Sequence, residues 1–220
     1  MKTKTMKITG ILLTFVMLVT MFGVFSLTAS AADGDACVST ADCTGTYANG
    51  FCTVCDGYEP AALVTEENYT ELGLTDAYIG YYAIQNAGNL YWFADLVDNE
   101  NAAYKTAKVV LTADITVNTG TMDANTTGAR EWNPIGYWGN SRDYAAFNGT
   151  FDGNNKKISG LYVNNTDNTA GKSVALIAET ESGALVKNVT VTNTWFHANG
   201  QVAGIVGDNG GTITGCVSEA

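Results

Sequence analysis

Four cysteines lie close together near the start of the chain, and they are the residues best suited to chemistry. Cys37, Cys43, Cys52 and Cys55 have the spacing C-x5-C-x8-C-x2-C, and Gly57 follows the last pair closely. A Cys-x-x-Cys pair followed by glycine forms a turn in which two thiolates can face one tetrahedral metal ion. The only histidine, His197, is far away in the sequence, so the spacing predicts a zinc site with these four cysteines as ligands.

Two disulfides are the competing interpretation of the same cysteines, and free thiols are a third. Disulfides persist in proteins that leave the cytosol. A segment of this size cannot stabilise itself by burial alone, so a metal or disulfides are expected either way. Because Cys-x-x-Cys pairs seldom bridge to each other, disulfides would join Cys52 and Cys55 to Cys37 and Cys43. Cys216 stands apart from the cluster and is expected to be a small, buried core residue.

The remaining candidates for catalysis are isolated residues. His197 has no recognisable partner, so we expect it to have no catalytic role. Asp152, in Phe-Asp-Gly-Asn-Asn, is expected to bond its own backbone in a tight turn, with a calcium ligand or a catalytic carboxylate as alternatives. A polysaccharide-cleaving site would need a pair of carboxylates, or a Lys or Arg base near calcium, on one face of the fold. The candidate carboxylates are Asp143, Asp152, Glu179 and Glu181.

Aromatic residues offer a different kind of site, a platform on which sugar rings stack. The candidates are Tyr81, Tyr82, Trp132, Tyr137, Trp138 and Tyr144. Trp and Tyr suit this role because the C–H faces of sugars are apolar. The alternative, which we favour, is that these rings pack the first part of the fold.

The N-terminal segment predicts export. Lys2, Lys4 and Lys7 precede an apolar run from 8 to 27, and Ala29-Ser-Ala31 resembles a signal-peptidase site, so the mature chain would begin at Ala32. An uncleaved membrane anchor is the alternative, and membrane contact is expected only through this segment. Its removal leaves 8 basic against 22 acidic groups, a formal net charge of −14. Such acidity argues against a nucleic-acid partner.

The elements after the cysteines change character along the chain. Residues 1–31 are assigned to the signal peptide, 32–60 to the Cys-rich segment, 61–104 to a connector and helix, and 105–220 to β structure. Between 86 and 100, apolar residues recur at helical spacing, at Leu90, Phe93, Ala94 and Val97. Asn86 or Asn89 could cap this helix at its start. From Val109 onward, short β runs alternate with Gly and Asn turns.

An internal repeat organises the last part of the chain. Residues 156–165, 184–193 and 211–220 align without gaps, which predicts three apolar columns. Between the first two columns of each segment lies a turn pair containing Gly or Asn, the residues that most readily adopt a left-handed backbone. A second strand, beginning at Val174, recurs at Val202. The columns are Ile158/Val186/Ile213, Leu161/Val189/Cys216 and Val163/Val191/Ser218.

This spacing predicts a mainly β fold, a right-handed parallel β-helix in which each coil stacks on the next. The alternative, an antiparallel sandwich, would give hairpins without a fixed column register. The helix at 86–100 is placed to cap the N-terminal end of the solenoid. Because the sequence stops within a coil at Ala220, we expect a truncated product or fragment.

The repeats resemble the GLUG-motif repeats of bacterial surface proteins. The stretch Gly200-Gln-Val-Ala-Gly-Ile-Val-Gly-Asp-Asn-Gly-Gly-Thr-Ile-Thr-Gly-Cys216 resembles the repeat itself, and residues 147–163 resemble its usual lead-in. The Cys-rich segment is similar to small zinc-ribbon-like units of Gram-positive surface proteins. The resemblance implies display outside the cell, and it places the catalytic parts of enzyme members outside the repeats.

These observations predict a secreted or cell-surface structural or adhesive module without catalysis of its own. Its expected partners are a surface glycan or a host protein. The alternative is the N-terminal fragment of a larger surface enzyme, either a polysaccharide lyase or hydrolase or an immunoglobulin-protease-type protein. No His-Glu-x-x-His protease motif occurs in the sequence.

Overall fold

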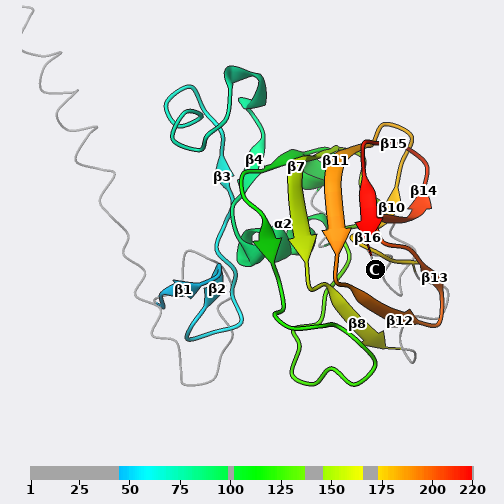
Figure 1. Cartoon of the computed structure of the whole chain (residues 1–220). Helices are drawn as coiled ribbons and strands as arrows, with labels where there is room; N and C mark the ends of the chain where they lie inside the picture. The colour runs from blue at the N-terminus through cyan, green and yellow to red at the C-terminus, as the bar shows by residue number, and fades with distance from the viewer. Residues whose placement is uncertain (1–44, 99–101, 137–145, 166–172, 220) are drawn as a thin grey trace, which may run out of the picture. The chain divides into compact units, whose positions relative to one another are not determined.

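The computed structural model describes residues 45–98, 102–136, 146–165 and 173–219, and it is mainly β (Figure 1). The predicted signal peptide at 1–31 lies outside the described residues, as do Cys37 and Cys43. All described residues belong to one compact unit, 36–220. Among them, no helix has the length and apolar character needed to cross a membrane.

The largest sheet has eight strands, in the order β15-β11-β7-β5-β4-β3, with β16 beside β11 and β6 beside β7 (Figure 1). From β4 onward every described strand pair is parallel, which argues against an antiparallel sandwich. Only β3 joins this sheet in the antiparallel sense. The strands are β3 Ala62–Leu63, β4 Tyr82–Ile84, β5 Lys108–Leu111, β6 Ile115–Thr116, β7 Thr150–Ser159, β11 Leu185–Thr192, β15 Thr212–Thr214 and β16 Val217–Glu219.

Three two-stranded parallel sheets accompany the large one, and together they repeat a fixed order. Strands β7, β8, β9 and β10 pair in turn with β11, β12, β13 and β14. The same sequence of strands is therefore laid down twice, side by side. The strands are β8 Tyr162–Asn165, β9 Ser173–Val174, β10 Ile177–Thr180, β12 Trp195–Ala198, β13 Gln201–Val202 and β14 Val206–Asn209.

The predicted columns are correct between the second and third repeat segments. Val186 pairs with Ile213, and Val191 pairs with Ser218. The second recurring strand is also confirmed, because Val202 pairs with Val174. Val186, Val189 and Val191 are fully buried, whereas Ile213 is 39% exposed at the rim of the sheet.

The predicted register of the first segment is wrong. Ile158 lies beside Val191, and Phe151 takes the place beside Val186 that the sequence alignment gave to Ile158. The residues after Ile158 are shifted in the same sense. Val163, which the alignment placed beside Val191, pairs instead with Phe196. The cause is a bulge in β7, where the three residues between Asp152 and Lys156 lie opposite a single residue of β11, Asn188.

Residues with a left-handed backbone, at the turns of the repeat segments (the corners), explain why the sequence alignment gave the wrong register for the first segment. Asn188 and Gly215 have φ of 54° and 62°, as the turn pairs predicted, and each lets two inward-facing residues flank it. Gly160 and Asn193 form a second corner, with φ of 80° and 50°. Because both corners use Gly or Asn, the sequence alone matched the second corner of one segment to the first corner of the next.

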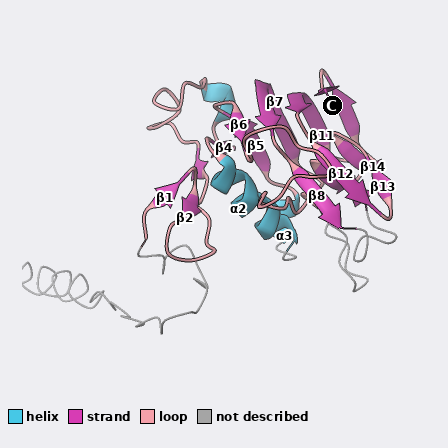
Figure 2. Cartoon of the chain, turned by 60° about the horizontal axis from the view of Figure 1, so that its bottom comes forward, coloured by secondary structure: helices cyan, strands magenta, loops and turns pink. Residues whose placement is uncertain are grey.

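The predicted helix is confirmed as α2, Ala87–Asp98. Asn86 caps it, since its side-chain oxygen accepts a 2.9 Å bond from the amide of Asn89. The short helix α3, Ala102–Lys105, follows, and both helices lie in the crossover between parallel strands β4 and β5. They pack along one face of the strands (Figure 2). The apolar residues of α2 share one core with Phe147, Phe151 and Ile158.

A smaller apolar cluster lies outside this main core. It joins Ala83 and Val110 of the sheet to Val64 and Leu74, with half-buried tyrosines around them. The segment between β3 and β4, including the short 3-10 helix Asp76–Tyr78, therefore packs against the sheet. Cys216 is free and only partly buried, and it packs against the main core beside the Val189 column.

Candidate functional site: an aromatic pocket beside the Cys-rich hairpin

The described part of the Cys-rich segment is a small antiparallel hairpin. Strands β1, Tyr47–Ala48, and β2, Phe51–Cys52, pair across the turn Asn49-Gly50. Both turn residues have positive φ, 51° and 79°, which gives a two-residue turn whose twist matches the flanking strands. The turn thereby sets which side of the hairpin carries Phe51.

The two described cysteines of this segment, Cys52 and Cys55, are disulfide-bonded. Backbone amides approach both sulfurs, with Val54 N 3.5 Å from Cys52 Sγ and Gly57 N 3.4 Å from Cys55 Sγ. Backbone amides of the turn after Cys52 thus lie against both sulfurs. Cys37 and Cys43 lie outside the described residues. A disulfide-bonded cysteine cannot ligate zinc, so a site of four thiolates would require reduced cysteines and stays a prediction.

The hairpin turn packs closely against the start of α2. Gly88 donates a 3.0 Å bond from its amide to the carbonyl of Asn49. A Cβ at Gly88 would overlap the backbone carbonyl of Gly50, so glycine is required for this approach. Glu59 adds two further links, because Asn86 and Asn89 donate side-chain bonds of 2.7 and 2.9 Å to its carboxylate and its carbonyl.

An open pocket of about 600 Å³ lies between the hairpin, α2 and the segment 117–131. Its aromatic wall is built by contacts between rings, with centroids 5.2 Å apart for Phe51 and Tyr91 and 5.6 Å apart for Tyr58 and Tyr91. Trp132 supports Tyr91 from behind at 4.9 Å. The lining residues are Asn49, Phe51, Tyr58, Tyr91, Val117, Asn118, Gly128, Arg130 and Glu131.

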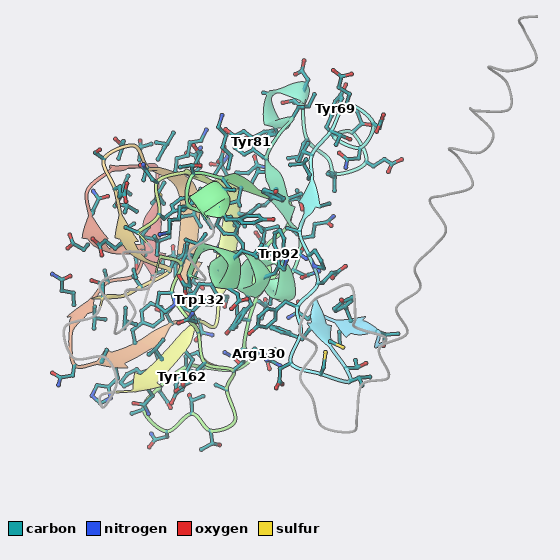
Figure 3. All side chains as sticks on the ribbon, turned by 180° about the vertical axis from the view of Figure 1, so that it is seen from behind. Tyr69, Tyr81, Trp92, Arg130, Trp132 and Tyr162 are labelled. Carbon is teal, nitrogen blue, oxygen red and sulfur yellow. The ribbon has the colours of Figure 1, made fainter. Side chains whose placement is uncertain are left out.

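Arg130 supplies the positive charge of this pocket. Its guanidinium carbon lies 3.8 Å from the centroid of the Phe51 ring, a cation–π contact. Figure 3 shows Arg130 on the side of the fold that carries the hairpin. Asn118 holds the backbone of Arg130 at both ends, accepting from its amide at 2.8 Å and donating to its carbonyl at 2.9 Å. The side chain therefore extends from an anchored position.

The tyrosines of the pocket stay protonated at neutral pH. Burial raises the pKa of Tyr91 well above its ordinary value. Its hydroxyl donates a 2.8 Å bond to the carbonyl of Glu131. Burial also raises the pKa of Tyr58, with the nearby Asp95 carboxylate adding to the effect and Arg130 opposing it. The wall is thus neutral, and its charge comes from Arg130 and Glu131.

The predicted aromatic platform is not brought together as such. Trp132 is buried, and Tyr82 packs against Trp92 and Tyr104, whereas Tyr81 belongs to the smaller cluster outside the main core. The packing interpretation is therefore confirmed for Trp132 and Tyr82. Tyr137, Trp138 and Tyr144 lie outside the described residues.

The sequence did not identify the residues that line the pocket, among them Phe51, Tyr58, Tyr91 and Arg130. Asn49-Gly50 is a strong hairpin signal that could have located Phe51. No pattern in the sequence indicated that Arg130 would lie against it.

Asp152 is buried, with 1% of its side chain exposed, within β7. It accepts a 2.8 Å bond from the amide of Asn154, so the predicted bond to its own backbone is confirmed. The sequence did not reveal its other partners, the Lys187 ammonium at 2.9 Å and the Tyr78 hydroxyl at 3.1 Å, which meet the same carboxylate oxygen. The hydrogen bond to Asp152 raises the pKa of Lys187, and burial followed by the Asp152 charge raises that of Tyr78.

We predict that Lys187→Met destabilises the protein by roughly 2 kcal/mol at pH 7, because it leaves the buried Asp152 charge without its cation. Since the pKa of Lys187 is raised in the folded state, this stabilisation is present at neutral pH and is lost as pH rises above about 10.5. Urea unfolding at pH 7 and at high pH measures both effects. Lys157→Met, at an exposed position on the same strand as Asp152, is the control, and an equal loss there would contradict the assignment.

Within the described residues, the other candidate catalytic residues are not assembled with Asp152 into one site. His197, on β12, is exposed, and its Nδ1 lies 2.8 Å from Asn164 Oδ1. Glu179 lies in the β10–β14 sheet, apart from the sheet that holds Asp152. Burial, followed by the charges of Asp208 and Glu181, raises the pKa of Glu179. Asp143 lies outside the described residues.

Comparison with known proteins gives one informative similarity. No family model matches the chain, and no solved structure matches it. Halomucin of Haloquadratum walsbyi, a surface-associated protein, is 32% identical over 150 residues, which is 68% of this chain. The chain spans only 2% of the length of halomucin. This limited similarity is compatible with a surface-type protein.

Proposed function

We propose that this chain is an exported cell-surface module of the structural or adhesive kind, and that it binds a glycan in the pocket beside the Cys-rich hairpin. Three features support the surface assignment: the export signal in the sequence, the acidic composition and the similarity to halomucin. The observation that carries the binding assignment is the pocket itself, in which aromatic rings and polar side chains line one cavity.

The architecture proposed for this module is a right-handed parallel β-helix of GLUG-like repeats. Its support is the fixed order in which four strands are laid down twice, each beside its counterpart. The inward residues of successive strands share columns, as in solenoids where each coil buries its apolar face against the next. In this architecture the β structure is a rigid support, and the hairpin and the segment 117–131 are carried on it.

A glycan suits the composition of the pocket. Sugars present apolar C–H faces to aromatic rings and hydroxyl groups to polar side chains, and this cavity offers both kinds of surface. Tyr58 is half-buried and contributes ring surface, while Arg130 and Glu131 contribute charged groups that can bond sugar hydroxyls. A host glycoprotein would engage the pocket through the same chemistry.

A binding role without catalysis fits the charged groups that the structure pairs. A lysine base must lose its proton at working pH, whereas the pKa of Lys187 is raised by its bond to Asp152. The Asp152 carboxylate is itself engaged by three donors. We therefore assign this cluster to stabilising the sheet.

The test is a glycan array probed with the mature chain, followed by titration of the strongest ligand. We expect Tyr58→Ala to weaken binding about tenfold or more, because it removes one wall of the pocket, while Tyr58→Phe keeps it. Tyr69→Ala is the matched control, since Tyr69 is a half-buried tyrosine of the separate cluster. Equal binding by the wild type and Tyr58→Ala would place the ligand elsewhere and refute the proposal.

Whether the four cysteines form disulfides or bind zinc is a separate proposal, because the pocket wall requires the hairpin but not one particular cross-link. We propose disulfides first, because Cys52 and Cys55 are disulfide-bonded and disulfides persist in exported proteins. The alternative is a reduced form in which four thiolates bind zinc. Intact mass with and without reduction, together with zinc content, separates the two. A mass four units lower than the reduced chain and no zinc would establish two disulfides.

A further inference from the structure

Arg130 is the only arginine among the described residues, and its donors are unengaged there. Its guanidinium lies over Phe51, yet no hydrogen bond or ion pair of that side chain occurs within the described parts of the chain. It lines the pocket beside Tyr58 and Asn118. The N–H donors of Arg130 are therefore available to bind a ligand in the pocket.

Stacking on the ring fixes how this arginine can act. The face of the planar guanidinium is occupied by Phe51, so its N–H groups, which lie in the plane, remain available at the edges. Two parallel N–H groups match the two oxygens of a carboxylate or of a sulfate. The bonds from Asn118 to both ends of the Arg130 backbone fix the start of the side chain, which lowers the cost of ordering it on binding.

The charge of the rest of the chain limits what this arginine can bind. With 8 basic and 22 acidic groups after export, the mature chain repels polyanions, and Glu131 lines the same pocket. A ligand with one acidic group suffers least from this repulsion and still pairs with Arg130. Because Arg130 is exposed, a neutral ligand would leave its guanidinium to water and would gain no charge pairing from it.

We infer that the pocket is specific for saccharides carrying a single acidic group, a carboxylate or a sulfate, which pairs with the Arg130 guanidinium while the sugar ring packs against Tyr58. This inference rests on the proposed glycan-binding function and adds the class of ligand to it. Either acidic group can present two oxygens to the two N–H groups of Arg130, so a carboxylated and a sulfated sugar must both be tested.

The experiment titrates the mature chain with 3′-sialyllactose, 3′-sulfolactose and lactose, which share a disaccharide and differ in the acidic group. We expect one or both acidic sugars to bind about tenfold more tightly than lactose, with the preferred one identifying the source. Arg130→Gln should bring the acidic sugars to the level of lactose, and Arg130→Lys should retain part of the preference. Lys108→Gln, which removes a charge stacked on Tyr81 outside the pocket, should change nothing.

Two outcomes would overturn the inference, and they can be told apart. If lactose binds as tightly as the acidic sugars, or Arg130→Gln binds them as the wild type does, while Tyr58→Ala still weakens binding, the acid specificity is wrong and the glycan pocket stands. If neither these sugars nor any glycan of the array binds in a way that depends on Tyr58, the proposed function falls together with the inference.

Discussion

Gly88→Ala is expected to abolish glycan binding while leaving the β structure folded. The added methyl group would overlap the carbonyl of Gly50, so the hairpin turn must move away from the start of α2. The 3.0 Å bond from Gly88 to Asn49 would then be lost, and the wall that carries Phe51 and Tyr58 would shift with it. We expect affinity to fall by more than tenfold, measured by titration with the array ligand.

The sign of the stability change distinguishes the effect of the hairpin contact from the effect of helix propensity. Alanine is the better helix former by about 1 kcal/mol, so helix propensity alone predicts that Gly88→Ala stabilises the protein. We instead expect a net loss of stability in urea unfolding. Asp95→Ala, at an exposed position of the same helix, controls for an added alanine. A Gly88→Ala variant that is more stable and binds normally would show that the hairpin does not pack as described.

The second large effect is expected from Phe151→Ala, which should lower the free energy of unfolding by about 3 to 5 kcal/mol. Phe151 is fully buried beside Val186 and near the apolar side of α2, so its removal leaves a cavity in the main core. Ile213→Ala is the matched control in the same column. Since Ile213 is 39% exposed, we expect its loss to cost less than about 1.5 kcal/mol. Equal costs at the two positions would contradict the described burial.

Engineered disulfides test the register that underlies this prediction. Ser159 and Thr192 lie side by side in β7 and β11, so Ser159→Cys with Thr192→Cys should cross-link on oxidation. The alignment of the sequence instead placed Ser159 beside Lys187. Peptide mapping that found a link in Ser159→Cys with Lys187→Cys, and none in the first pair, would restore the sequence-based register.

The sequence was sufficient where the fold repeats itself. The spacing of Val186 and Ile213 located a parallel pair, and the helical spacing at Leu90 and Phe93 located α2. It was insufficient for the first repeat segment because the bulge after Asp152 shifts the register, and the corner at Gly160 has the same chemistry as the corner at Asn188. Periodicity cannot distinguish two corners that use the same residue types.

The pocket could not be predicted because it is built by contacts between distant segments. Phe51 and Arg130 meet across the fold, and neither belongs to a repeat. Their contact depends on the packing of Gly50 against Gly88, which no local pattern encodes. The ion pair of Asp152 and Lys187 was missed for the same reason, since it follows from the pairing of β7 with β11. Residue types alone indicated only that aromatic rings were plentiful.

Hydrogen exchange of the mature chain, with and without the strongest glycan ligand, tests the central claim most directly. Binding in the pocket should slow exchange in peptides that cover 49–58 and 117–131, because these segments form its walls. Peptides from β12 to β16 should exchange at the same rate in both states. Protection confined to those later strands, or no protection at saturating ligand, would contradict the account.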